Sequence, residues 1–307
     1  MSVTFDVIVP TYDNPDELAA CLDGLAQQTF RNFRVLLCID GESPGVRRLV
    51  ERTSFPFDVV VLSHPALAHR GRNATRNLAL TAIRSPLLAM LDSDVVPSPR
   101  WLDEHYALLR QDCCISLGDI RYTNTQDNVW ARYIQTRGKN KYHHRDRVPY
   151  YYFTTGNVAL ASKYFVQVGG QDEHMRSYGG GDTELAIRLQ KAFTLPVIFN
   201  AQAVGWSHMN KTLVQALEQL QQFGGENLPY IVGKHPEVRE IFGVEYLRGQ
   251  RIRDRLLRML ARSPMPDVLL RCVPNPIAPV ERAIIHFAVF SAIARGWMYR
   301  DRGAAAQ

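Results

Sequence analysis

The sequence predicts an α/β fold in which helices flank a mostly parallel β-sheet. Short apolar, β-branched runs of the kind that form buried strands alternate with helical patterns along the first half of the chain. Strand–helix–strand order favours parallel pairing with helices on both faces. The length of 307 residues, with 46% hydrophobic and 21% charged residues, suits a globular protein with one large domain and an appendage.

The expected elements can be placed in order along the chain. Apolar residues spaced by three and four from Leu18 to Leu25 indicate the first helix. Asp13 or Asn14 suits its N-cap, and Pro15 suits its first turn. Strands are expected at 6–10, 33–39, 58–62, 87–91, 156–161 and 197–200, and further helices at 73–83, 162–168, 182–192 and 212–222.

Three polar clusters follow predicted strands at their carboxyl ends, where α/β sheets bind ligands. They are Thr11-Tyr12-Asp13, Asp40-Gly41-Glu42 and Asp92-Ser93-Asp94. In the third cluster, two carboxylates at positions i and i+2 share a direction only if both leave the strand at its end. There they suit a hard divalent cation, which prefers oxygen ligands and bridges phosphates. An acidic turn after a strand is the alternative for so short a motif.

Six short segments occur in a fixed order and together carry a family resemblance. They are IVPTYD (8–13), LLCIDGES (36–43), RGRNATRN (70–77), MLDSD (90–94), TGN (155–157) and GGDTELAIRL (180–189). In this order they resemble the inverting family 2 glycosyltransferases, over about residues 3–210. The resemblance implies the GT-A fold, a Rossmann-like sheet that binds a nucleotide diphosphate-sugar.

The resemblance also implies a donor site, for which a UDP-sugar is expected. It assigns donor contacts to Pro10, Thr11, Tyr12, Asp13, Asp40, Arg72, Arg76, Asn77, Asp92 and Ser93. Asp40 is expected to accept a hydrogen bond from a base N–H, and a turn residue before Gly41 is its alternative. An arginine fork suits phosphate, and which of Arg70, Arg72 and Arg76 contacts the donor stays open.

The implied cofactor is Mn²⁺ or Mg²⁺. Asp94 is expected to coordinate it directly, and Asp92 to do so or to reach the ribose. His208 resembles a late histidine of the family and is expected as a third ligand, with a packed or surface histidine as the alternative. The cation would stabilise charge that grows on the leaving β-phosphate.

Inversion requires a carboxylate that takes the proton of the attacking acceptor, and the resemblance places Asp182 in this role. Asp182 follows three glycines and opens a predicted helix, whose N-terminus favours an ionised carboxylate. A structural N-cap is the alternative. Gly156, Asn157 and Gly181 are expected on the acceptor side, and Gly181 stands where the family often has a glutamate. Glu184 is expected to face the sheet or a partner arginine.

The chain is expected to divide into a catalytic domain and a basic extension. The domain spans 1–247, with a donor half at 1–97 and an acceptor half at 98–247, and the mostly helical extension spans 248–307. Segment 248–302 contains 11 arginines, no lysine and four acidic residues, a charge of +7 that leaves −1 for the rest. A basic amphipathic helix is expected at 251–262. Five prolines and an apolar helix at 284–297 follow, and that helix is shorter than the ~20 residues needed to cross a bilayer.

Two interpretations of the extension stay open. Its basic helices would rest on an anionic membrane surface, which favours a lipid-linked or polysaccharide acceptor in cell-envelope glycan assembly. Alternatively, they cover the catalytic domain and form a homodimer interface. Nucleic acid is not expected as a partner, because the first 247 residues are near neutral and carry no nucleic-acid-binding signature.

The leading expectation is an enzyme that transfers a hexose, with inversion and with a divalent metal, from a nucleotide diphosphate-sugar to an acceptor hydroxyl. A non-catalytic nucleotide-sugar-binding protein or membrane-surface scaffold of the same fold is the alternative. Five scattered cysteines outside any metal-ligand spacing, together with the absence of a signal-peptide pattern, favour a cytoplasmic location. Peripheral attachment to the inner face of the membrane would follow from the membrane interpretation.

Overall fold

The computed structural model describes residues 4–110, 113–248, 251–263, 265–270 and 278–304. The chain forms two compact units. The first combines Met1–Thr123, Gln135–Arg176 and Gly181–His208, and the second combines Asn124–Ile134, Ser177–Gly180 and Met209–Gln307. The predicted division at residue 247, and the donor and acceptor halves within it, stay predictions.

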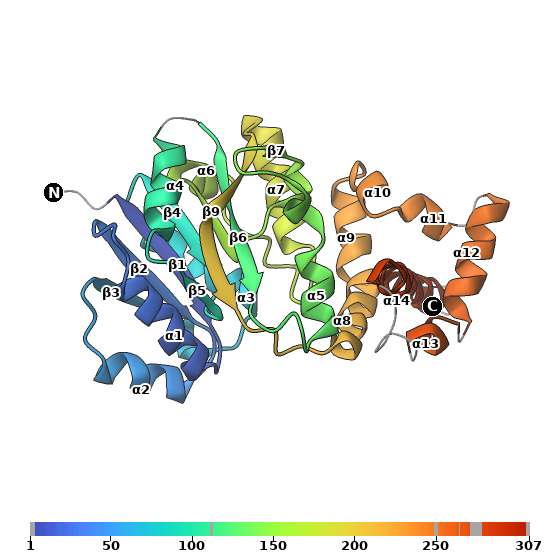
Figure 1. Cartoon of the computed structure of the whole chain (residues 1–307), viewed down its shortest axis with the longest axis horizontal. Coiled ribbons are helices and arrows are strands. Elements are labelled where there is room, and N and C mark those ends of the chain that lie inside the picture. Colours follow the sequence, from blue (N-terminus) through green and yellow to red (C-terminus); the bar gives the residue numbers. More distant parts are fainter. Residues whose placement is uncertain (1–3, 111–112, 249–250, 264, 271–277, 305–307) are drawn as a thin grey trace. The chain divides into compact units, whose positions relative to one another are not determined.

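A single mixed sheet forms the centre of the first unit, with the strand order β3-β2-β1-β4-β8-β6-β9-β5 in the described residues (Figure 1). The strands are β1 (Phe5–Thr11), β2 (Phe33–Ile39), β3 (Asp58–Ser63), β4 (Leu87–Leu91), β5 (Val95–Pro97), β6 (Ile115–Tyr122), β8 (Asn157–Ala161) and β9 (Val197–Ser207), and the short β7 (Arg147–Val148) pairs with β9. β3, β2, β1 and β4 are parallel, and β8 runs antiparallel to β4 and β6. Since β6 and β9 are parallel, the carboxyl ends of β1, β2, β4, β6 and β9 share one edge.

Helices cover both faces of this sheet (Figure 1). Val7, Val9 and Leu37 point to the face covered by α1 (Pro15–Ala26), α2 (Pro44–Arg52) and α4 (Trp101–Leu109). Ile8 and Leu36 point to the opposite face, which packs against α6 (Ser162–Gln167) and α7 (Gly181–Phe193). The alternation follows from the two-residue period of a strand, and burial on both faces explains why the central residues of β1 and β2 are apolar.

The predicted α/β class is confirmed, and the donor-side strands lie where the sequence predicts them. β2 and β4 have the predicted bounds, and β9 continues to Ser207 instead of ending at residue 200. The predicted helix at 73–83 is a short α3 (Arg72–Asn77) followed by a 3₁₀ turn (Leu78–Thr81). Helix α2 is absent from the sequence prediction, although Val46, Leu49 and Val50 follow the three- and four-residue spacing of a helix and pack on the core.

The second unit is helical in its described part. It contains α8 (Leu213–Gly225), α9 (Asn227–Lys234), α10 (Val238–Ile241), α11 (Val244–Arg248), α12 (Ile252–Arg262), α13 (Met265–Leu270) and α14 (Ala278–Ala304), together with most of α5 (Val129–Gln135). Trp130 and Tyr133 of α5 pack with Ile285 and Val289 of α14. The predicted helix at 284–297 is the middle of α14. Cys272 and three of the five prolines, Pro264, Pro274 and Pro276, lie outside the described residues.

A membrane-spanning helix was not expected from the sequence. Within the ranges that the structure describes, no helix combines the length and the apolar character that crossing a bilayer requires.

Candidate functional site

The loop after β1 is tied to the acidic cluster after β4. The hydroxyl of Thr11 donates to Asn14 Oδ1 at 2.6 Å, and Asn14 Nδ2 donates to the hydroxyl of Ser93 at 2.9 Å. Asn14 occupies the N-cap position of α1, but its side chain makes no cap hydrogen bond. Its side chain instead joins the ends of two neighbouring strands, and Pro15 takes the first turn of the helix as predicted.

The loops after β1 and β2 contain two non-glycine residues with left-handed backbones. Asp13 has a φ of 47° and Ser43 a φ of 40°, and the Asp13 backbone N–H donates to Ser43 Oγ at 3.2 Å. Ser43 Oγ in turn donates to the Asp40 carbonyl at 2.8 Å. Such backbones cost about 1–3 kcal/mol each and concentrate at ligand-binding sites. Asp13 is exposed and lies outside α1, so it does not cap that helix.

Asp40 is buried, and its carboxylate has protein partners. It accepts from the backbone N–H groups of Arg70 at 2.7 Å and Gly71 at 2.9 Å, and it lies 2.9 Å from His69 Nδ1. The carboxylate therefore fixes the loop before α3. The exposed Tyr12 ring lies 4.4 Å from the His69 ring, centroid to centroid, and leaves an aromatic surface above this loop.

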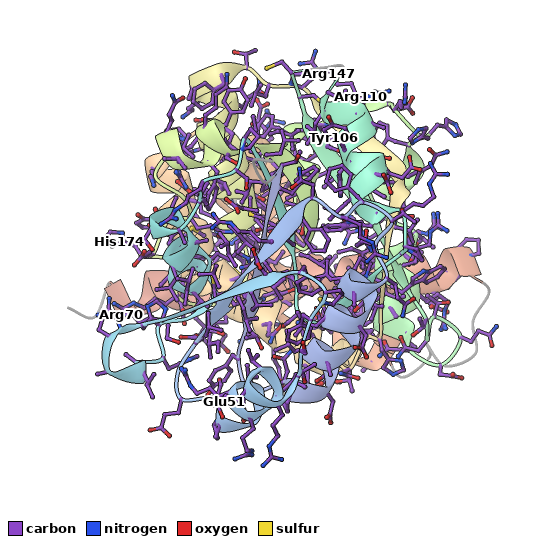
Figure 2. The ribbon with its side chains drawn as sticks, turned by 90° about the vertical axis from the view of Figure 1, so that its left-hand side faces the viewer. Glu51, Arg70, Tyr106, Arg110, Arg147 and His174 are labelled. Carbon is purple, nitrogen blue, oxygen red and sulfur yellow. The ribbon has the colours of Figure 1, made fainter. Side chains whose placement is uncertain are left out.

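The arginines of the 70–77 segment differ in their environment. Arg76 is buried, and its guanidinium donates to Asp92 Oδ1 at 2.5 Å. Although burial disfavours its charge, the carboxylates of Asp92 and Asp182 raise the pKa of Arg76 above its usual value. Arg70 and Arg72 are exposed, and Figure 2 shows Arg70 at the molecular surface. Arg76 thus holds the acidic cluster, whereas Arg70 and Arg72 lie at the surface.

Two amides of α3 hold the loop that leads toward Asp182. Asn73 Nδ2 donates to the carbonyls of Asp172 and Met175. Asn77 Nδ2 donates to the Gln171 carbonyl at 2.8 Å, and Asn77 Oδ1 accepts from the Gln171 N–H at 2.7 Å. The side chain of Asn77, predicted to contact the donor, is therefore engaged with the protein.

The carboxylates of Asp92 and Asp94 fit a hard divalent cation. Asp94 is exposed, yet the protein atoms crowded around its carboxyl, and then the charge of Asp92, raise its pKa to about 6. Relief of that repulsion favours a cation, and both groups offer oxygen ligands. Strands β5 and β9 are antiparallel, and Val95 pairs with Ser207. If this pairing continues by one residue, Asp94 lies opposite His208.

His208 itself is exposed, and its Nδ1 lies 3.3 Å from the hydroxyl of Thr123. No group of three or more His, Cys, Asp or Glu side chains among the described residues is arranged to hold an ion. The three-residue ligand set of Asp92, Asp94 and His208 stays a prediction.

Asp182 lies in the first turn of α7, one residue inside a helix that begins at Gly181. Its Oδ1 accepts a hydrogen bond from the hydroxyl of the buried Thr155 at 2.8 Å. A Cβ at Gly181 would lie 3.0 Å from the amide of Asn73, so a larger residue is crowded there. A Cβ at Gly156 would lie 2.8 Å from Asp92 Oδ2, which places the 155–156 segment between Asp92 and Asp182.

Asn157, predicted on the acceptor side, is completely buried. Its Oδ1 accepts from Trp101 Nε1 at 2.8 Å and lies 3.1 Å from His105 Nε2, and its Nδ2 donates to the carbonyls of Asp119 and Ala203, both at 2.9 Å. All hydrogen-bonding capacity of this amide is therefore used inside the sheet. Burial of His105 lowers the pKa of its imidazole to about 4, so the network contains a neutral histidine near pH 7.

Glu184 is completely buried and pairs with Arg188 at 2.8 Å, as predicted for a partner arginine. The sequence gives no signal for Gln171. Its side chain is 3% exposed, and neither its Oε1 nor its Nε2 has a hydrogen-bond partner among the described residues. Its Oε1 would lie 3.2 Å from a Cβ at Gly181, next to Asp182.

Comparison with curated proteins gives distant relatives. The chain is 26% identical over 219 residues to the chondroitin synthase of Escherichia coli, an alignment that covers 60% of this chain and 32% of that protein. It is also 26% identical over 230 residues to the validoxylamine A glucosyltransferase of Streptomyces hygroscopicus subsp. jinggangensis, covering 65% of this chain and 54% of that protein. The chain thus spans about a third of the first of these relatives and about half of the second.

Solved structures with the same fold cover nearly the whole chain. Staphylococcus aureus TarS 1-349 in complex with UDP matches 99% of this chain and 92% of that one, with a TM-score of 0.56 and 15% identity. The mannosyltransferase PcManGT of Pyrobaculum calidifontis, in complex with GDP-Man and Mn²⁺, matches 99% of this chain and 75% of that one, with a TM-score of 0.53 and 15% identity. The predicted GT-A fold is confirmed.

The family model described as glycosyl transferase family 2 matches residues 6–170, which is more than half of the chain. That match contains five of the six segments from which the sequence predicts the family. The chain therefore belongs to glycosyl transferase family 2.

Proposed function

We propose that this protein transfers a hexose from a nucleotide diphosphate-sugar, for which a UDP-sugar is our first choice, to an acceptor hydroxyl with inversion at the anomeric carbon. The observation that carries the proposal is the position of Arg76. Its buried guanidinium donates a hydrogen bond to Asp92, and the charges of Asp92 and Asp182 both raise its pKa. A residue of the acidic cluster and the proposed base therefore belong to one electrostatic site.

The donor would lie against the carboxyl ends of β1, β2 and β4. We assign the nucleoside to the loop formed by Pro10, Thr11, Tyr12 and Asp13. Asp40 would contribute to this site by holding the neighbouring loop through the backbone N–H groups of Arg70 and Gly71. We assign the diphosphate to Arg72 and the Asp92-Ser93-Asp94 cluster. Mn²⁺ or Mg²⁺ held by Asp94, with Asp92 and His208, would neutralise the departing diphosphate.

In the proposed reaction the acceptor oxygen attacks the anomeric carbon on the face opposite the diphosphate. The bond from that carbon to the phosphate oxygen breaks, and Asp182 takes the acceptor's proton. Thr155 orients the carboxylate through one oxygen and leaves the other for the acceptor. Gly156 and Gly181 lack a side chain, which lets Asp92 and Asn73 pack closely beside the segments that carry Thr155 and Asp182.

We further propose a glycan or lipid-linked acceptor and a cytoplasmic protein attached to the inner membrane face through the segment 248–302. The curated relatives include a chondroitin synthase, which supports a glycan acceptor. The charge of +7 in this segment supports attraction to anionic lipid. A homodimer formed through the same segment is the competing arrangement.

The replacement Asp182→Asn tests the base. It keeps the shape of the side chain and removes the proton acceptor. Donor turnover is expected to fall by about 10²–10⁴-fold, while UDP binding, measured by calorimetry in the presence of Mn²⁺, stays unchanged. Full activity of this variant would show that Asp182 is not the base. Loss of UDP binding would place it in the donor site instead.

A further inference from the structure

Helix α12 turns its apolar stripe outward. Ile252, Leu256 and Met259 follow one another at helical spacing and are 79%, 51% and 60% exposed. The opposite side of the helix is buried through Asp254 and Ala261. A helix that packs on a core normally buries its apolar stripe, so this orientation leaves an apolar surface without cover from the described part of the second unit.

Packing within the second unit fixes this orientation. The Arg295 side chain of α14 donates to the Ala261 carbonyl at 2.9 Å and to the Ser263 carbonyl at 3.1 Å. Arg258 Nε lies 3.4 Å from Met298 Sδ, also on α14. At the other end of α12, the Asp254 carboxylate accepts from the Arg251 N–H at 3.1 Å. The contacts of Arg258, Ala261 and Ser263 hold the C-terminal half of α12 against α14.

Arginines flank the exposed stripe. Arg251, at the N-cap of α12, and Arg255 are both exposed, and Arg255 precedes Met259 by four residues, which sets it about 40° around the helix from that side chain. Asp254, the acidic residue of α12, is turned inward. The neighbouring α13 adds Met265 and Val268 to the exposed apolar surface.

We propose that the α12 outer face, formed by Ile252, Leu256 and Met259 with Arg251 and Arg255, binds bilayers that contain anionic lipid. An apolar stripe would enter the boundary between headgroups and acyl chains, while the arginines contact lipid phosphates. The charge favours a membrane over a second copy of the chain, because two such faces would bring arginines together. The inference rests on the proposed membrane attachment and names its residues and its lipid class.

Vesicle flotation of the full chain, without any sugar nucleotide, tests this surface. The vesicles contain phosphatidylcholine alone or phosphatidylcholine and phosphatidylglycerol in equal parts. The wild type is expected to float with the anionic vesicles and to stay in solution with the neutral ones. The variant Ile252→Ser/Leu256→Ser/Met259→Ser is expected to lose roughly tenfold or more in vesicle affinity. The variant Arg251→Gln/Arg255→Gln is expected to lose about fivefold per arginine.

Two matched controls separate this face from general surface effects. Arg48→Gln/Arg52→Gln removes two exposed arginines at the same spacing on α2. Val61→Ser/Val166→Ser/Val214→Ser removes three exposed apolar side chains elsewhere. Both controls are expected to float as the wild type does, and circular dichroism checks that every variant folds.

Equal flotation of the wild type and the α12 variants would overturn the proposal, as would a wild type that floats with neither vesicle. If the apolar variant converts a dimer to a monomer in light scattering and flotation does not change, the face is an interface between copies. Donor turnover of the α12 variants in free solution is expected to equal that of the wild type. A failure of sugar transfer would leave the flotation result unchanged, so the two proposals fail independently.

Discussion

The carboxylate of Asp182 accepts a hydrogen bond from Thr155 at 2.8 Å. Thr155→Val removes the hydroxyl while it keeps the buried volume. Because a hydrogen bond to a charged group contributes about 1.5–3 kcal/mol, we expect donor turnover to fall about tenfold, less than for Asp182→Asn. Thr155→Ser keeps the hydroxyl and is expected to keep most of the activity. Equal losses for valine and serine would show that packing, and not the hydrogen bond, matters at this position.

The side-chain amide of Gln171 is buried next to the proposed base and has no hydrogen-bond partner in the part of the chain that the structure describes. Unpaired buried polar atoms cost about 1–3 kcal/mol. We therefore expect Gln171→Met to raise the free energy of unfolding by about 1–2 kcal/mol, a rise in Tm of about 2–4 °C per kcal/mol. Calorimetry measures this change.

Gln28 is the matched control for Gln171. It is also buried, but its amide donates to the carbonyls of Gly24 and Ser98 and accepts from the Leu102 N–H. Gln28→Met is expected to lower Tm. A fall in Tm for Gln171→Met as well would mean that a ligand such as water holds this amide.

His105 makes stability depend on pH. Burial lowers its pKa to about 4, against about 6.5 in an unfolded chain. Between these values the unfolded state binds the additional proton, so the free energy of unfolding falls as pH falls from 6.5 to 4. The full loss is on the order of 3 kcal/mol. Urea titrations at several pH values are expected to show this slope in the wild type and to lack it in His105→Gln. An unchanged slope in the variant would assign it to other groups.

The structure brings some of the predicted site residues close together and engages the side chains of others inside the protein. Arg76 donates a hydrogen bond to Asp92, and the nearby charge of Asp182 raises the pKa of Arg76, although the two aspartates belong to different segments. Asn77 and Asn157 have the residue types of ligand contacts, but their amides are engaged by segments 94 and 38 or more residues away. Such partners depend on tertiary packing, which residue type and spacing do not specify.

At the scale of elements, prediction succeeded where a buried pattern is strong. β2 and β4 are buried on both faces and read as continuous apolar runs. The outer side of α12 shows the opposite case. Its periodicity predicts an amphipathic helix correctly, but a period alone does not say whether the apolar side faces a core or the solvent.

Helices α8 and α14 approach at glycines within the second unit. A Cβ at Gly296 would collide with the Gln221 carbonyl, and a Cβ at Gly224 with the Ile293 carbonyl. We expect Gly296→Ala to destabilise this unit by about 1–3 kcal/mol, because backbone and not a flexible side chain would have to move. Chemical denaturation measures the change. A Cβ at Gly233 in α9 would have no neighbouring atom within 4 Å. The control variant Gly233→Ala is therefore expected to raise the free energy of unfolding by about 0.5–1 kcal/mol. Equal effects of the two changes would contradict backbone contact between α8 and α14.

At the scale of the whole molecule, the net positive charge lies outside the part of the chain that matches the family. The segment 248–302 has a charge of +7, while the rest of the chain, which includes the family match at 6–170, is near neutral. The isoelectric point of 9.1 therefore results from the excess of arginines in segment 248–302, and not from the proposed donor site. In the proposed donor site Arg76 pairs with Asp92, one of the two carboxylates after β4, so we expect the positive charge that offsets Asp94 to come with the ligand.

We therefore expect stabilisation of the protein by a nucleotide ligand to depend on the metal ion. A ligand that binds only the folded state stabilises it by about 2.7 kcal/mol at a hundredfold excess over Kd. We expect UDP with Mn²⁺ to raise the Tm of the wild type, and UDP with EDTA to raise it far less, because the diphosphate then meets Asp92 and Asp94 without a cation. Asp94→Asn is expected to remove most of the metal-dependent shift. Asp16→Asn, an exposed carboxylate in the first turn of α1, is expected to keep it. A metal-dependent shift that survives in Asp94→Asn would move the cation away from the acidic cluster.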